Sequence, residues 1–68
     1  MTMTKGKVAT EIVKLPYERP ARLAMGTIAA LAHWRASTGE HGNEYQNGHE
    51  RMYVVADGSA FSVMWEHE

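Results

Sequence analysis

The last third of the chain carries the pattern of a β-hairpin. Two runs of strand-favouring residues, 51–56 and 59–65, flank the pair Asp57-Gly58. Asp-Gly between alternating hydrophobic residues is a strong signal for a two-residue hairpin loop. With Asp57 and Gly58 as the loop, Val54 lies opposite Phe61. One face of the hairpin then carries Met52, Val54, Phe61, Val63 and Trp65. The other face carries Arg51, Tyr53, Ser62 and Glu66.

The length of the chain limits its core. A domain of 68 residues buries only about 60% of the surface that its unfolded chain exposes. The sequence contains no cysteine, which excludes disulfides and thiolate zinc sites. Small domains without such supports often gain stability by association. We therefore expect a homo-oligomer or a complex with a larger protein.

Nothing in the sequence indicates a membrane or a secretory route. No apolar run approaches the ~20 residues that span a bilayer. The start of the chain is basic but has no apolar segment behind it, so it does not read as a secretory signal. We expect a soluble, cytoplasmic protein with no membrane partner.

Residues 1–6 are expected to form a flexible tail, and 7–68 a single domain. The β-branched residues Val8, Thr10, Ile12 and Val13 favour a strand that stops before Pro16. A helical stripe of Val8, Ile12 and Leu15 also fits this segment, so its secondary structure stays open.

A helix is expected over 20–36, with Pro20 as its first residue and Gly39 closing its end. Its central apolar stripe comprises Leu23, Thr27, Ala30, Leu31 and Trp34, and its flanks carry Met25, Ile28, Ala29 and Ala32. A small sheet cannot cover so much apolar surface. We predict a dimer interface at the small pair Gly26 and Ala30; alternatively, Gly26 lies over the sheet under a bulky residue such as Trp65.

Glycine and polar residues over 37–49 predict one long polar loop. The expected fold is therefore α+β: a small β-α-β-β domain with one helix on a three-stranded, mainly antiparallel sheet and a C-terminal hairpin.

The possible chemistry of the loop rests on histidines and glutamates. His33, His41 and His49 recur every eight residues, with Glu40, Glu44 and Glu50 nearby. No two histidines stand in the (i, i+4) relation of a helical zinc motif, so we expect no metal and no cofactor. A phosphate-binding loop and a nucleophile motif are also missing, and we expect no enzyme.

The segment 13–23, Val-Lys-Leu-Pro-Tyr-Glu-Arg-Pro-Ala-Arg-Leu, resembles the strand-to-helix junction of ribbon-helix-helix repressors. The resemblance implies a dimeric DNA-binding regulator whose N-terminal strands pair and enter the major groove. The family's second helix is absent from the pattern, and a pI near 6.4 argues against binding driven by phosphate charge. DNA binding is the alternative function.

Charge and aromatic residues favour protein binding instead. Residues 1–36 hold six Lys and Arg against two Glu, a net of +4, whereas 37–68 hold one Arg against six acidic residues, a net of −5. Tyrosines beside charged groups are common interface anchors. The predicted partner-binding residues are Glu44, Tyr45, Glu50, Arg51 and Tyr53.

In size and in its lack of cysteine and catalytic motifs, the chain resembles small accessory proteins of phages and mobile elements. Some of these inhibit host enzymes or host defence. The expected function is a non-enzymatic protein that binds and modulates, by inhibition, a larger host protein or protein–nucleic-acid complex.

Overall fold

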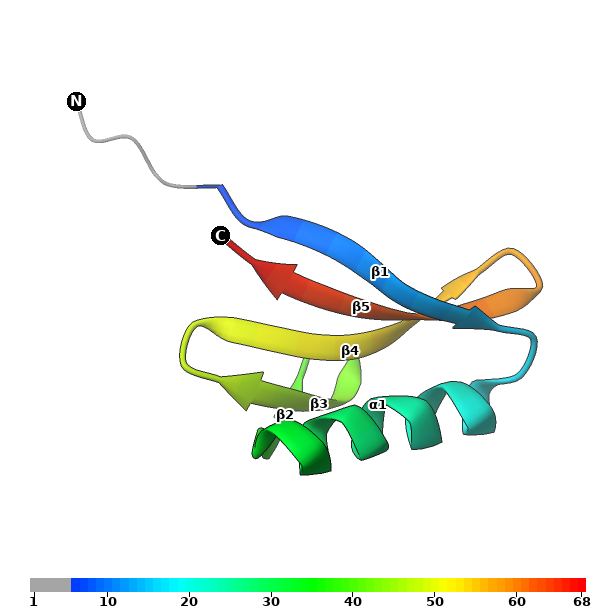
Figure 1. Ribbon diagram of the computed structural model, residues 1–68. Helices are drawn as coiled ribbons and strands as arrows, with labels where there is room; N and C mark the ends of the chain where they lie inside the picture. The colour runs from blue at the N-terminus through cyan, green and yellow to red at the C-terminus, as the bar shows by residue number, and fades with distance from the viewer. Residues whose placement is uncertain (1–5) are drawn as a thin grey trace.

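The computed structural model describes residues 6–68. Within this range, a single helix lies across one face of a five-stranded antiparallel sheet of order β1-β5-β4-β3-β2 (Figure 1). The elements are β1 (Val8–Leu15), α1 (Glu18–Ala32), β2 (Arg35–Gly39), β3 (Gly42–Asn47), β4 (Glu50–Asp57) and β5 (Ala60–His67). The predicted α+β class is confirmed, although the sheet has five strands where three were expected. The predicted tail over 1–6 lies, Gly6 apart, outside the described residues.

The two additional strands come from the segment that was expected to be a loop. Most of residues 37–49 lie in β2 and β3, which pair with each other, and β3 also pairs with β4. Two-residue turns join β2 to β3 and β3 to β4. The prediction of one long loop was wrong because these strands have few apolar residues, and the pairing of β3 with β4 has no local sequence signal.

The first segment is a strand, which decides the question that the sequence left open. β1 pairs with β5 along its length, from Val8 opposite His67 to Leu15 opposite Phe61. The register shifts between Glu11 and Val13, and Ile12 has no partner on β5. Such a β-bulge bends the strand and increases its twist.

The C-terminal hairpin is present, but its turn lies one residue later than predicted. Asp57 pairs with Ala60, so the loop residues are Gly58 and Ser59, and Val54 lies opposite Val63. Gly58 has a φ of 64°, as the first loop residue of a type II′ turn requires. The pairing register differs from the prediction by two residues. Because side chains alternate between the two faces with a period of two, every side chain still lies on its predicted face.

The helix is shorter than predicted and buries a different stripe. It ends at Ala32, and His33 caps it in the left-handed conformation. Ala21, Met25 and Ala29 recur every four residues and are buried. They pack against three residues of the sheet, Met52, Val54 and Val63. Leu23 and Leu31, which were expected in the central stripe, are 66% and 79% exposed.

The choice of stripe follows from side-chain size. Ala21 and Ala29 are small enough to let the helix backbone approach the sheet, and Met25 fills the space between them. Gly26 also lies near the sheet: a Cβ at this position would be 3.4 Å from the hydroxyl oxygen of Tyr45.

Within the described residues, no helix has the length and apolar character needed to cross a membrane.

Candidate functional site

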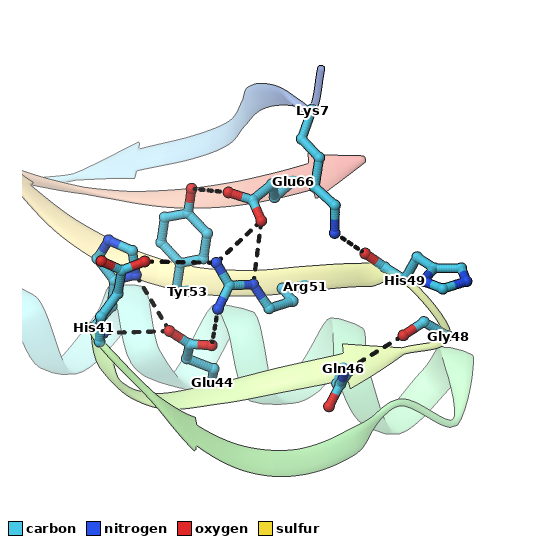
Figure 2. A network of polar contacts seen from close by, with 10 residues as sticks. Lys7, His41, Glu44, Gln46, Gly48, His49, Arg51, Tyr53 and Glu66 are labelled. Carbon is cyan, nitrogen blue, oxygen red and sulfur yellow. Dashed lines mark hydrogen bonds and ion pairs between the residues drawn. The ribbon is translucent and has the colours of Figure 1, made fainter. Parts of the chain in front are cut away.

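The face of the sheet away from α1, which we call the open face, carries a cluster of charged side chains (Figure 2). We call it the Arg51 network, and its members are Glu40, His41, Glu44, Arg51, Tyr53 and Glu66. These residues come from the β2–β3 turn and from β3, β4 and β5. The cluster therefore joins four consecutive parts of the chain on one face.

Arg51 is the centre of this network. Its Nε and Nη2 both donate to Oε1 of Glu66, at 3.2 and 3.0 Å, and its Nη1 donates to Oε1 of Glu44 at 3.3 Å. Glu40, which is mostly exposed, lies 3.7 Å from Nη2. The hydrogen bond to Glu66, and then the charges of the nearby carboxylates, raise the pKa of Arg51 above its ordinary value despite partial desolvation. The guanidinium is thus held by three carboxylates.

Glu44 is the most unusual member because it is only 2% exposed. Its Oε2 accepts a hydrogen bond from the backbone N–H of His41 at 3.3 Å and lies 3.2 Å from Nδ1 of the same residue. A buried carboxylate is costly unless it is paired and hydrogen-bonded. Gly39 leaves room for it, since a Cβ there would lie 2.5 Å from the carboxylate.

Tyr53 is covered by the β2–β3 turn. The His41 ring stacks on the Tyr53 ring with centroids 3.9 Å apart and an interplanar angle of 6°. The Tyr53 hydroxyl donates to Oε2 of Glu66 at 3.5 Å. Tyr53 was expected on an exposed face, but it is 6% exposed because the turn lies over it.

The interactions of this network are structural, because its charged groups pair with one another within the chain. The guanidinium of Arg51 and the carboxylates of Glu44 and Glu66 are partnered within the chain. The turn and three strands are thereby connected on the open face, where the helix cannot stabilise them. Groups that already satisfy one another contribute little to binding a partner unless the network opens.

The five predicted partner-binding residues do not form one patch. Glu44, Arg51 and Tyr53 belong to the Arg51 network, whereas Tyr45 packs against the core under the helix. Glu50 accepts a hydrogen bond from Nε1 of Trp65 at 2.7 Å. Of the predicted dimer residues, Gly26 lies beside Tyr45 and Ala30 is exposed.

The histidines are also spread out. His33 caps the helix, His41 lies in the Arg51 network and His49 lies in the β3–β4 turn. Over residues 6–68, no group of three histidine or acidic side chains is placed to hold a metal ion.

The largest exposed apolar side chains lie in the other half of the chain. Val8 and Ile12 of β1 are 52% and 40% exposed, and Tyr17, which precedes the helix, is 69% exposed. Leu23 and Leu31 of α1 are exposed as well. The unpartnered apolar surface therefore lies on β1 and α1 and on the residue that precedes the helix. The excess of apolar residues in the helix was the sequence signal for this surface, although the wrong stripe was assigned to the core.

Searches against protein-family models, curated proteins and solved structures found no match for this chain.

Burial of Tyr53 predicts a loss of stability at alkaline pH. Burial first, and the nearby Glu66 second, raise its pKa above the ordinary value of 10.0. The folded state therefore holds this proton more tightly than the unfolded state, and the free energy of unfolding falls as the pH rises from 10.0 through the raised pKa.

Urea unfolding at neutral and alkaline pH measures the effect. The Tyr53→Phe variant should lose less stability between the two conditions than the unchanged chain. Tyr17→Phe, at an exposed position, serves as the control and should behave like the unchanged chain. Equal alkaline losses in all three proteins would contradict the prediction.

Proposed function

We propose that this chain is a non-enzymatic interaction protein that binds and inhibits a larger host protein through the outer face of α1. The outer face consists of Tyr17, Pro20, Leu23, Thr27, Ala30 and Leu31, all of which are exposed. At 100° per residue these positions form one continuous stripe. The exposure of Leu23 and Leu31, 66% and 79%, is the observation that carries the proposal.

An exposed apolar stripe with a basic border suits a protein partner. Arg19 and Arg22 lie at one border of the outer face, and Arg35 follows its C-terminal end. Arg22 is engaged with Glu18 at 2.9 Å, and Arg19 is exposed. Apolar residues bordered by charge are typical of interaction sites, and the arginines favour an acidic rim on the partner.

The binding mode follows from this surface. A helix docks into a hydrophobic groove through apolar residues spaced at i, i+3, i+4 and i+7. Leu23 and Ala30 stand at i and i+7, and Leu31 adjoins Ala30 on the same outer face. The proposal places the complex in the cytoplasm, a reducing compartment that agrees with a sequence free of cysteine.

The first step of the test is to capture the partner from cells that naturally contain the chain. The affinity of the purified partner is then measured for the unchanged chain and for matched surface variants. Leu23→Glu and Leu31→Glu should each weaken binding at least about ten-fold, because each puts an unpaired charge into an apolar contact. Thr38→Glu, at an exposed position of β2, should bind normally. Circular dichroism should show an intact fold in all three.

Two other outcomes would replace the proposal. Normal binding by the leucine variants, with loss on Glu50→Lys in a chain whose circular dichroism shows an intact fold, would assign the function to the residues predicted from the sequence. Tight binding to duplex DNA that weakens steeply with salt and is lost in Lys7→Glu would establish the DNA-binding alternative.

A further inference from the structure

The two edges of the sheet differ in length and composition. β2 forms one edge with five residues, Arg35–Gly39, of which only Ala36 is apolar. β1 forms the other edge with eight residues, and five of them are apolar. Natural proteins shorten or charge their edge strands because free backbone groups pair readily with another strand. The β2 edge is short and polar, whereas the β1 edge remains long and apolar.

The exposed side chains of β1 mark the same edge. Val8 and Ile12 are 52% and 40% exposed. Ile12 has no partner on β5, because the bulge falls at this residue. An apolar residue at the centre of a free edge strand is unfavourable in a monomer and becomes covered if another strand lies beside it.

We infer that β1 pairs with β1 of a second copy, antiparallel, about a two-fold axis between Ile12 and Val13. The two five-stranded sheets then become one continuous sheet. In this register Glu11 lies opposite Lys14 of the partner subunit, and Ile12 lies opposite Val13 of the partner subunit. The two-fold axis generates each of these pairs twice.

The faces of the strand agree with this register. Glu11 and Lys14 both lie on the open face, since Glu11 accepts a hydrogen bond from Ser62 at 2.9 Å and Lys14 pairs with Ser62 in the ladder. Val13 and Leu15 lie on the helix side, packed against the core. Residues opposite each other in an antiparallel pair point to the same face. The ammonium group of Lys14 has three donors, so it can keep its 2.8 Å contact with Asp57 and also meet Glu11 across the axis.

Charge selects this register over its nearest competitor. A shift by two residues keeps Lys14 opposite a residue of the open face, Ala9, but it places Glu11 opposite Ile12 and leaves both charges without a partner across the axis. In the inferred register each carboxylate faces an ammonium group, and opposite charges across a strand pair are stabilising. Oε1 of Glu11 contacts Ser62 and lies 3.9 Å from Lys14. Within residues 6–68, no hydrogen bond involves the second oxygen, Oε2.

The inference is tested by sedimentation equilibrium of charge variants from micromolar to millimolar concentration. The unchanged chain should form dimers. Glu11→Lys and Lys14→Glu should each raise the dimer dissociation constant about ten-fold or more, because both pairs become repulsive. An equimolar mixture of the two variants should associate again as a heterodimer, since each copy then supplies the charge that the other lacks.

The heterodimer is the decisive result because damage to the fold of either variant cannot produce it. Thr38→Lys on the β2 edge is the matched control and should dimerise like the unchanged chain. Amide hydrogen exchange should show protection in β1 that increases with concentration. A monomer at all concentrations would overturn the inference, as would a dimer that Leu31→Glu disrupts while both β1 variants associate normally.

Discussion

Replacing Arg51 with methionine should lower the free energy of unfolding by about 3 kcal/mol, because it leaves a buried carboxylate without its charged partner. The carboxylate is that of Glu44, which is 2% exposed and receives Nη1 of Arg51 at 3.3 Å. The substitution also removes the two bonds to Glu66. Urea unfolding followed by circular dichroism measures the loss.

A double-mutant cycle identifies the cause of this loss. Glu44→Gln removes the buried charge, so Arg51→Met combined with Glu44→Gln should cost less than the sum of the two single changes. Arg19→Met is the matched control. It makes the same change at an exposed arginine of α1, and such surface substitutions usually alter stability by at most about 0.5 kcal/mol. Additive costs in the cycle would show that the network is not a cooperative unit.

The second large effect is expected in the core. Met25→Ala should cost about 3 kcal/mol, since removing a buried side chain of this size leaves a cavity. Met25 is 1% exposed and packs between the helix and the sheet. A domain of this size has about 3–5 kcal/mol of stability, so the variant should be largely unfolded at modest urea concentrations.

The control for this experiment lies on the same helix. Leu31→Ala removes a side chain that is 79% exposed and should change stability by at most about 0.5 kcal/mol. The two variants test which stripe of the helix is buried. The stripe assigned from the sequence contains Leu31, whereas the stripe observed in the structure contains Met25. Equal losses in both variants would mean that the outer face of α1 is covered in solution.

Alternating residues in the last third of the chain were sufficient to predict the hairpin and its two faces. The division between Val54 and Val63 on one side and Tyr53 and Ser62 on the other is a local property, because side chains alternate along any strand. It therefore survived an error of two residues in the register. β-branched residues likewise favoured a strand for β1, although a helical pattern remained open.

The face of the helix that packs on the sheet could not be predicted from the local sequence pattern alone. Its sequence is apolar on more than one face, so periodicity alone could not decide whether Leu23 or Met25 points to the sheet. Packing decided it, because small residues such as Ala21 and Ala29 let the backbone approach the strands. The two leucines were left exposed, and they became the basis of the proposed binding surface.

β2, β3 and the Arg51 network depended entirely on tertiary structure. The residues of these two strands are mostly polar. β3 becomes a strand because β4 offers a free edge for pairing, and β2 then pairs with β3. The burial of Glu44 depends on Arg51, seven residues later, and on the β2–β3 turn that carries His41. Side-chain alternation is set within a strand and can be read from neighbouring residues. The pairing of polar strands and the burial of a charge depend on partners that only the folded chain brings together.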